Sequence, residues 1–414
     1  MKKVAIVGGG VVGLCSAYYL NALGYEVSVI SDDLEKKGCS YGNAGMIVPS
    51  HFIPLAAPGV ILMGLKWMLR PDSPFHIHPR LNSDLISWGL KFYKASTAKH
   101  VENSKSVLSN LNLSSRELYL DIQEKENIDF SLKTKGLFML CKTKKGLEEE
   151  THVARLSNKL GIPAEVLSPR ELMEIDKNVE LDVEGGVYFP LDACFNPTLF
   201  MNQMHLVLQQ KGVKFISDKV ESININGNKV TSLETTHQEI IADEFIIAAG
   251  IWSTNLLQSL EVNIPMQGGK GYSVMVENPA TKPEICSLLC EARVSVTPMG
   301  DSIRFGGTME LNGTDMSISH QRLAGIFKSI PQYYPQFKEK DFLSAPTWVG
   351  LRPCSPDGLP YIGRFKNYTN LTAATGHAMM GMSLGPITGK LISQIIAGHK
   401  TNIDISQLNP NRYN

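Results

Sequence analysis

Three glycines near the start of the chain have the spacing of a phosphate-binding turn. Gly8, Gly10 and Gly13 form G-x-G-x-x-G within VAIVGGGVVGLCSAYYLNALGYEVSVI. The first glycine of this pattern permits a tight turn, the second lets a pyrophosphate approach the backbone, and the third allows close helix packing. A secretion signal or membrane anchor fits poorly, because the glycines interrupt the apolar run and no good cleavage site follows. We therefore expect a nucleotide-binding turn.

The flanking residues predict the elements that must position this turn. Residues 4–7 are a short β-rich run, typical of a buried parallel strand. Apolar residues recur at helical spacing over 11–23, Gly24 follows as a C-terminal stop, and residues 27–30 form a second strand. A βαβ unit of about 30 residues is a more specific nucleotide signal than the glycines alone.

The position expected to bind a ribose is irregular. An acidic residue at the end of the second strand normally binds a ribose hydroxyl. Here that position is Ser31, and Asp32 and Asp33 follow directly after it. The ribose contact is therefore not assigned to a single residue.

The composition predicts a two-domain globular protein with no nucleic-acid partner. A chain of 414 residues, 43% of them hydrophobic, exceeds what one core usually supports. The 40 basic and 40 acidic residues balance, so no basic surface indicates nucleic acid. No charge run, low-complexity tract or internal repeat stands out.

The cysteines and histidines predict neither a disulfide framework nor a metal site. The seven cysteines include no C-x-x-C pair, and an odd number without framework spacing is typical of reduced thiols in a cytosolic protein. We therefore expect a cytoplasmic protein whose cysteines act as small core hydrophobes. His76 and His78 in FHIHP lack a third ligand, so we expect no metal.

A second strand–glycine–helix junction lies in the middle of the chain. The small-residue turn at Ala249 and Gly250 leads to a helix that begins near Trp252, which suits a long dinucleotide. The elements before it are a helix at 199–208, a strand at 213–216, two strands around the Asn-Gly turn of KVESININGNKVTSLET, and a strand at 244–248.

A third junction lies near the C-terminus. The glycine-rich TGHAMMGMS joins a strand at 371–374 to an apolar helical face that begins at Leu384, and Ser383 is the expected cap. Such a junction points helix N-terminal amides at a ligand. Upstream, KKGCSYGNAGMIVPS is dense in small and polar residues, so a backbone could run close along the same ligand.

These motifs together resemble the FAD-dependent amino acid oxidoreductases, the D-amino acid oxidase-like family of D-amino acid dehydrogenase, glycine oxidase and sarcosine oxidase. The resemblance spans the chain, and NAGM and the closing glycine motif are most similar to the D-amino acid dehydrogenase branch, including its hydroxyproline-type members. Ser31 is a departure. The motifs are the opening glycines, SYGNAGMI from Ser40, AAGIWS from Ala248, GLRPCSPDGLPYIG from Gly350 and GHAMMGMSLGPITG from Gly376.

The resemblance implies an α/β fold with two parts. A Rossmann-like FAD-binding domain would comprise residues 1–50, 195–262 and 345–414. An α+β substrate domain over 51–194 and 263–344 would carry a mostly antiparallel sheet, with strands in GLFMLCK, GGVYFP, GYSVMVE and SIRFGGTME.

The resemblance also implies the residues that hold FAD. The methionines at 379, 380 and 382 could instead fill the core. The implied set is Gly8, Gly10, Gly13, Ser31, Asp32, Ser40, Asn43, Ala44, Gly45, Met46, Val220, Ala249, Gly250, Trp252, Gly376, Met379, Met380, Gly381, Met382 and Ser383.

Amino acid oxidation through a flavin needs few protein groups, because the cofactor takes the hydride. The expected essential group is a carboxylate anchor, and Arg352 in GLRP is its candidate, with a surface ion pair as the alternative. His377 either lines the substrate pocket or is satisfied within a packed turn. Tyr272 either lines the pocket or packs in the core.

The expected function is oxidation of a D-amino acid, such as D-proline or its hydroxylated form, with electrons passed to a quinone or another acceptor. The alternatives are a glycine- or sarcosine-type oxidase that uses dioxygen, a flavin monooxygenase, and a non-catalytic FAD-binding subunit. The sequence does not fix the amino acid, the acceptor, covalent attachment of FAD or the oligomeric state.

One apolar segment bears on the acceptor. The run at 60–69, within residues 54–74, is too short to span a bilayer. It either forms a lid or wall over the substrate site or lies on a membrane surface to reach a quinone.

Overall fold

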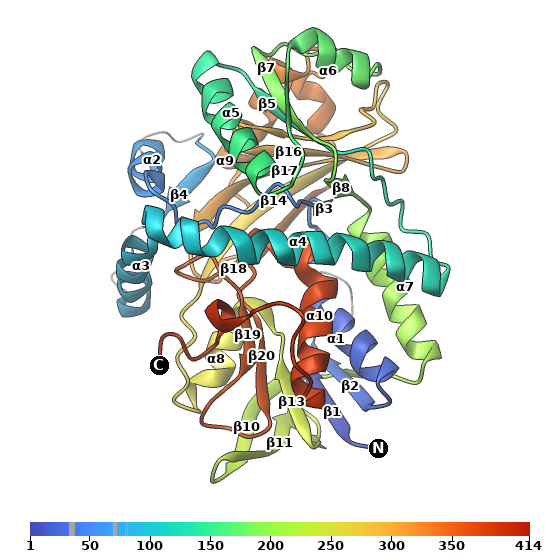
Figure 1. Cartoon of the computed structure of the whole chain (residues 1–414), viewed down its shortest axis with the longest axis vertical. Helices are drawn as coiled ribbons and strands as arrows, with labels where there is room; N and C mark the ends of the chain where they lie inside the picture. The colour runs from blue at the N-terminus through green and yellow to red at the C-terminus, as the bar shows by residue number, and fades with distance from the viewer. Residues whose placement is uncertain (33–37, 69–72, 79, 81) are drawn as a thin grey trace.

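The computed structural model describes the whole chain except residues 33–37, 69–72, 79 and 81. Two large β-sheets lie at opposite ends of the molecule, and the long helix α4 (Ala98–Glu126) crosses between them (Figure 1). One sheet is mainly parallel and the other mainly antiparallel, so the expected α/β fold with a second α+β part is confirmed.

The first sheet contains the predicted nucleotide-binding unit. Its order is β19-β20-β13-β1-β2-β9, and only the β19–β20 pair is antiparallel. Later strands lie on both sides of β1, and a crevice for ligands forms at the carboxyl ends of strands at such a reversal. The strands are β1 (Lys3–Val7), β2 (Glu26–Ser31), β9 (Lys214–Ser217), β13 (Glu244–Ile247), β19 (Tyr361–Arg364) and β20 (Leu371–Thr375).

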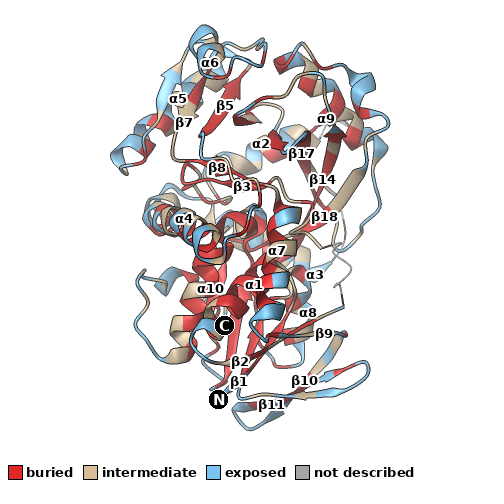
Figure 2. Cartoon of the chain, turned by 90° about the vertical axis from the view of Figure 1, so that its right-hand side faces the viewer, coloured by how far each residue is buried: buried red, intermediate tan, exposed pale blue. Residues whose placement is uncertain are grey.

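Side chains alternate between the two faces of this sheet, so the sheet lies between a layer of helices and a second covering layer. Val4 and Ile6 pack against helices, whereas Ala5 and Val7 face a small antiparallel sheet. Both faces are therefore covered, which explains the continuous apolar strands, and Figure 2 shows β1, β2 and α10 largely buried. The helices are α1 (Val11–Ala22), α7 (Pro197–Gln210) and α10 (Gly381–Ala397); the opposite layer holds β10 (Val220–Asn226), β11 (Lys229–Thr235), β12 (Glu239–Ile241), η1 (Gly250–Trp252) and α8 (Ser253–Gln258).

Helix α4 belongs to the core of this first part. Its Leu111 and Tyr119 lie in one cluster with α1 and α10, and the Tyr119 hydroxyl donates to the Met382 carbonyl. The expected division assigned residues 51–194 to the substrate domain, so α4 departs from it. The apolar stripe of α4 finds its partner at the far end of the chain, which helical periodicity does not reveal.

The second sheet has the order β18-β14-β17-β16-β15-β5-β7-β6, with β4 beside β17. The strands predicted in GLFMLCK, GGVYFP, GYSVMVE and SIRFGGTME are β5, β7, β14 and β17. The sheet comprises β4 (Phe75–Ile77), β5 (Leu137–Cys141), β6 (Glu165–Leu167), β7 (Gly185–Phe189), β14 (Gln267–Glu277), β15 (Cys286–Leu289), β16 (Val294–Met299), β17 (Ser302–Leu311) and β18 (Thr347–Cys354).

The two faces of this sheet have different neighbours. Phe305 and Val274 pack against helix α9 (His320–Tyr333) on one face. On the other face the Ser273 hydroxyl donates to the Gly42 carbonyl at 3.1 Å, so this face meets the loop after β2. The remaining elements are β3 (Met46–Ile47), which pairs with β8 (Ala193–Cys194), and the helices α5 (Lys144–Lys159), α6 (Pro169–Ile175), η2 (Glu339–Phe342), η3 (Ala378–Met380) and η4 (Ser406–Leu408).

Two short helices, α2 (Val60–Met68) and α3 (Ser83–Ala95), flank β4 at one edge of the molecule (Figure 1). Gly64 of α2 lies against the Phe75 ring, so α2 covers β4. Leu69, the last residue of the predicted apolar run, lies outside the described residues. Over the described part of the chain, every helix is too short or too polar to cross a bilayer.

Helix α10 packs so closely on α1 that a glycine is required between them. A Cβ at Gly389 would collide with the Cys15 carbonyl group, whereas Gly89 in α3 has open space at the same position. We expect Gly389→Ala to lower the free energy of unfolding by about 1–3 kcal/mol or more, because neither backbone can yield without separating the helices. Gly89→Ala is the matched control and should be neutral or stabilise by up to about 1 kcal/mol. Equal denaturation midpoints for the two variants would contradict this packing.

Candidate functional site

The predicted glycine turn lies at the carboxyl edge of the parallel sheet. Gly8 adopts φ +115°, which L side chains rarely adopt, and a Cβ there would collide with the Ala248 carbonyl at the end of β13. A Cβ at Gly13 would collide with the Gly8 carbonyl. The first and third glycines are therefore required by packing.

Gly10 differs from the other two glycines, because packing alone does not require it. Among the described residues, the atom within 4 Å of a Cβ at Gly10 would be the Ser40 Oγ, at 3.3 Å. Ser40 Oγ also accepts from the Val11 amide at 2.9 Å, at the start of α1. The second glycine thus keeps backbone open in front of a helix N-terminus, an arrangement that fits a pyrophosphate.

Ser31 and Val220 come together beyond β2. The Asp218 amide donates to the Ser31 carbonyl at 3.2 Å, and β10 begins at Val220 two residues later. Asp32 is exposed next to them, and Asp33 lies outside the described residues. The structure therefore places Ser31, Asp32 and Val220 at one edge of the sheet.

The second junction also lies at this edge, where Ala249 borders the Gly8 turn. Gly250 adopts φ +56° with open space around its Cβ position, and its carbonyl accepts from the Thr375 hydroxyl at 2.9 Å. Trp252 is half exposed at the end of η1. Residues from three distant segments thus meet at the same edge of the sheet.

The loop that contains Asn43, Ala44, Gly45 and Met46 is held by an arginine that the sequence analysis missed. Arg304 Nη1 donates to the Tyr41 and Asn43 carbonyls at 2.9 and 2.6 Å. Burial lowers the pKa of Arg304 to about 10. Arg304 is 261 residues from Asn43 along the chain, so no local pattern could have indicated this contact.

A buried carboxylate ties down the segment that follows this loop. Asp192 accepts from the Ser50 amide at 3.0 Å and from the Ser50 hydroxyl at 2.5 Å, and Ser50 Oγ lies 2.9 Å from His51 Nδ1. Burial raises the pKa of Asp192 to about 7. Asp192 was not among the residues predicted from the sequence.

The closing junction differs from its prediction in one respect. Gly376 adopts φ +78° and η3 follows, but α10 begins at Gly381 with Met380 as its cap residue, so Ser383 lies in the first turn. The Ser383 hydroxyl accepts from the Val48 amide at 3.1 Å and donates to Asn112 Oδ1 at 2.7 Å. The side chain therefore connects three segments and is not the helix cap.

The three methionines of this junction have different environments. Met379 is 45% exposed, Met380 is partly buried and Met382 is buried in the core with α1. Met382 therefore takes the core-filling alternative.

Arg352 lies on β18, with its guanidinium across Gly271 of β14, where any Cβ would collide with it. Nη1 donates to the Thr308 carbonyl at 2.8 Å. Burial lowers the pKa of Arg352. Among the described residues no carboxylate pairs with it, so the surface ion-pair alternative has no partner and N–H groups remain for a ligand.

A bulge in β17 explains why no acid reaches Arg352. Lys270 pairs with Glu310 but Tyr272 pairs with Gly307, so β17 carries one extra residue, and Thr308 adopts φ +67°. The bulge turns the Thr308 carbonyl toward Arg352. It also turns the Glu310 side chain to the opposite face.

Trp348 is a further neighbour of Arg352 that the sequence analysis missed. Its indole ring fills the positions where a Cβ at Gly350 or at Gly42 would lie. Gly350 and Gly271 are paired across β18 and β14. Two facing glycines thus make the floor on which the indole and the guanidinium lie.

Tyr272 takes the core-packing alternative, because it lies on the other face of the sheet from Arg352. It is buried in the cluster with α9, its hydroxyl donates to Glu310 at 2.5 Å, and the Ser319 amide donates to that hydroxyl. Burial and the Glu310 carboxylate raise its pKa. The prediction that Tyr272 lines a pocket beside Arg352 is therefore wrong.

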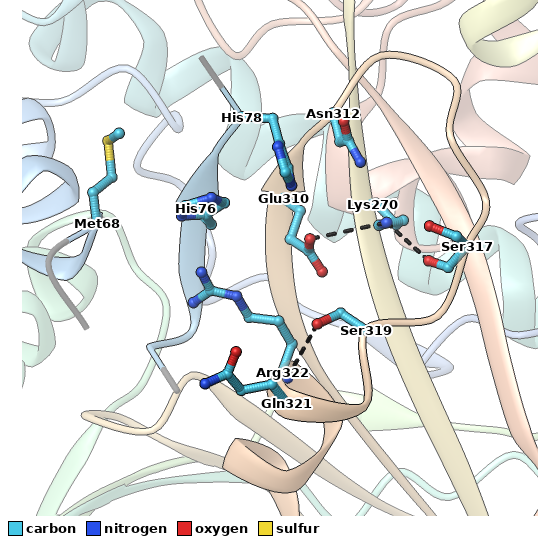
Figure 3. A pocket seen from close by; sticks show the side chains of 10 residues that line it. All are labelled: Met68, His76, His78, Lys270, Glu310, Asn312, Ser317, Ser319, Gln321 and Arg322. Carbon is cyan, nitrogen blue, oxygen red and sulfur yellow. Dashed lines mark hydrogen bonds and ion pairs between the residues drawn. The ribbon is translucent and has the colours of Figure 1, made fainter. Parts of the chain in front are cut away.

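Behind Arg352, that opposite face has a polar hollow of about 410 Å³ (Figure 3). Buried Lys270 lies 2.9 Å from Asp315 and 3.9 Å from Glu310 in its wall. His76 and His78 line it with ring centroids 5.1 Å apart. Within the described residues no third ligand completes a metal site.

His377 is satisfied within a packed turn. It is buried, and its Nε2 lies 3.0 Å from the Thr388 hydroxyl of α10. Burial lowers its pKa to about 3. This geometry favours the packed-turn alternative over a pocket-lining role.

A comparison with known families identifies the chain, since residues 3–395 match the model of the FAD dependent oxidoreductases. The chain belongs to this family. FAD is accordingly its cofactor.

Named members of this oxidoreductase family match over nearly the whole chain. A D-amino acid dehydrogenase of Granulibacter bethesdensis is 30% identical, covering 99% of each chain. One of Helicobacter pylori is 31% identical over 98% of this chain and 97% of its own.

Solved structures share the fold at lower identity. A glycine oxidase from Geobacillus kaustophilus has a TM-score of 0.79 at 21% identity, covering 100% of both chains. An L-proline dehydrogenase from P. horikoshii has a TM-score of 0.74 at 18% identity, covering 100% of this chain and 97% of its own.

The burial of His377 makes the stability of this oxidoreductase depend on pH. Its folded pKa of about 3 lies below the ordinary value of 6.5, so between these values the unfolded chain binds more protons and stability falls as the pH falls. We expect the unfolding free energy of wild type relative to His377→Gln to drop by roughly 2 kcal/mol from pH 8 to pH 5. Exposed His399→Gln is the control variant. A pH-independent difference between wild type and His377→Gln would show that His377 is not held neutral.

Proposed function

We propose that this chain is an FAD-dependent D-amino acid dehydrogenase. The names of relatives at about 30% identity over nearly their full length support this activity. The glycine oxidase and L-proline dehydrogenase folds support the architecture alone. The observation that carries the proposal is a partly buried arginine, Arg352, without a described carboxylate partner.

Arg352 binds the substrate carboxylate in this proposal. A guanidinium offers two parallel N–H groups to a carboxylate, and Thr308 and Gly271 hold it in one orientation. Fixing the carboxylate fixes where the α-carbon lies, and the chirality of the substrate then decides which substituent occupies the remaining space.

The space beside Arg352 is apolar. A Cβ at Gly269 would approach Cys354 and Met309, which lie on the same face as Arg352. Leu311, Trp88 and the rings of neighbouring segments complete this cluster. It favours a D-amino acid with an apolar side chain, and a cyclic one such as D-proline or its hydroxylated form is the expected type.

The chemistry requires no catalytic acid or base from the chain. FAD, when bound, accepts the hydride that leaves the α-carbon. The amine must be neutral at that moment, and its proton passes to water. His377 is buried, neutral and bonded to Thr388, so it positions the junction and does not take this proton.

We assign FAD to the predicted set without Met382, which is buried in the core. Among the described residues, Gly10 and Gly250 leave open backbone for it. Ser31 and Asp32 lie where a ribose contact is expected. Arg304 keeps the Tyr41 and Asn43 carbonyls in place.

The finer part of the proposal concerns the acceptor. A dehydrogenase passes electrons to a quinone or dye in preference to dioxygen, and a quinone in a membrane calls for peripheral contact with that membrane. An oxidase of the glycine oxidase type is the second candidate, favoured only by the shared fold.

Removing the Arg352 guanidinium should impair turnover without loss of FAD. We expect Arg352→Ala to lower kcat/KM for the best D-amino acid roughly 10- to 150-fold, because a charge-assisted pair is lost. Arg352→Lys should restore only part of it, since the fork geometry is gone. Arg170→Ala, which removes an exposed ion pair with Glu174, is the matched control. Unchanged kinetics in Arg352→Ala would show that another residue binds the substrate carboxylate.

The stereochemical assignment is tested by anaerobic titration with paired D- and L-amino acids. We expect the D-forms, and apolar or cyclic ones most strongly, to bleach the flavin absorbance. Dye reduction in air should be much faster than peroxide formation. Bleaching by L-forms alone would refute the assignment to the D-amino acid dehydrogenases. Equal rates of peroxide formation and dye reduction would indicate an oxidase. No bleaching by any amino acid would indicate a non-catalytic FAD-binding subunit.

A further inference from the structure

Helix α3 is apolar on two opposite faces. Trp88 and Phe92 point inward, and Trp88 Nε1 donates to the Cys354 carbonyl at 2.9 Å, two residues from Arg352. Ile86, Leu90 and Tyr93 are 54%, 59% and 69% exposed. Their spacing of four and three residues puts them in one row on the outer face. The inner face is thus packed against β18, whereas no side chain of the described residues buries the outer row.

Helix α2 has the same arrangement. Gly64 is buried against Phe75 of β4, whereas Leu62 and Leu65 are 61% and 56% exposed. Lys66 follows Leu62 by one turn, so a cation borders this apolar row.

The two helices belong to one side of the molecule. Phe75, against which α2 packs, lies in the same apolar cluster as Trp88 and Phe92 of α3. Figure 1 shows both helices at the same edge, on either side of β4, and in Figure 2 both lie on the side away from the viewer. We call the exposed residues Leu62, Leu65, Ile86, Leu90 and Tyr93 the outer apolar surface.

The charges around this surface are mainly positive. Residues 60–99 contain two acids, Asp72 and Asp84. The basic residues of that range are Lys66, Arg70, Arg80, Lys91, Lys94 and Lys99. An apolar row bordered by lysines is complementary to a bilayer with anionic headgroups, since the side chains enter the interface while the cations meet the phosphates.

We propose that the outer apolar surface of α2 and α3 docks on an anionic lipid bilayer. This rests on the proposed function, in which the acceptor is a quinone, and it assigns the contact to specific residues. Neither helix can cross the bilayer, so both lie in the interface. The inner side of α3 reaches β18 through Trp88, so docking brings the Arg352 side of the substrate sheet next to the membrane.

The test uses the FAD-loaded full chain and sedimentation with two kinds of vesicle. One kind is phosphatidylcholine alone, and the other contains equal amounts of phosphatidylcholine and phosphatidylglycerol. Wild type should bind the mixed vesicles better. Leu65→Glu/Leu90→Glu should weaken that binding about tenfold or more. Lys66→Gln/Lys94→Gln should weaken it roughly fivefold per lysine on mixed vesicles and leave neutral vesicles unaffected.

The matched control is Leu199→Glu/Leu206→Glu, which changes two exposed leucines on α7. Equal vesicle binding by the control and by Leu65→Glu/Leu90→Glu would overturn the proposal. A second outcome would also overturn the proposal: wild type forms dimers and binds no vesicles, and Leu65→Glu/Leu90→Glu is monomeric. That result would show that a second copy of the chain covers the surface.

Turnover with a soluble dye separates this proposal from the proposed function. Leu65→Glu/Leu90→Glu should reduce the dye at the wild-type rate while losing vesicle binding. Vesicle binding by a wild-type chain that oxidises no D-amino acid would refute the proposed function and keep the docking surface.

Discussion

The site depends on the absence of side chains at two facing glycines. Gly271 and Gly350 are paired across β14 and β18, and the Arg352 guanidinium and the Trp348 indole occupy the spaces that side chains there would fill. A partly buried guanidinium is costly unless an anion or several acceptors satisfy it. Arg352 has one described acceptor, the Thr308 carbonyl, so its position favours a ligand with a carboxylate.

The bulge at Thr308 keeps the Glu310 carboxylate on the face of the sheet opposite Arg352. Because β17 carries one extra residue there, Glu310 faces α9 with Lys270 and Tyr272, where its charge is paired. On the Arg352 face Glu310 would neutralise the guanidinium and compete with a substrate carboxylate. One backbone irregularity thus separates a satisfied polar cluster from an arginine that has no described carboxylate partner.

The cofactor crevice and the substrate sheet are joined by long-range contacts. Arg304 reaches from β17 to the loop after β2, and the Ser273 hydroxyl of β14 donates to the Gly42 carbonyl of the same loop. These bonds fix the nucleotide-binding part against the sheet that carries Arg352. A reaction between a cofactor and a substrate needs this fixed geometry, because small displacements of the reacting atoms slow it strongly.

The sequence by itself determined the nucleotide turn and the strands around it, because glycine spacing and apolar periodicity are local properties of the chain. Arg352 as the carboxylate anchor stays a prediction. Tertiary structure decided which side of the sheet each candidate occupies. Tyr272 and Arg352 lie on neighbouring strands, yet the alternation of side chains along β14 and β18 puts them on opposite faces. Helix α4 packs with α1 and α10, and Ser383 lies in the first turn of α10 and not at its cap. Their partners lie hundreds of residues away in the chain, so no local sequence pattern could have predicted either contact.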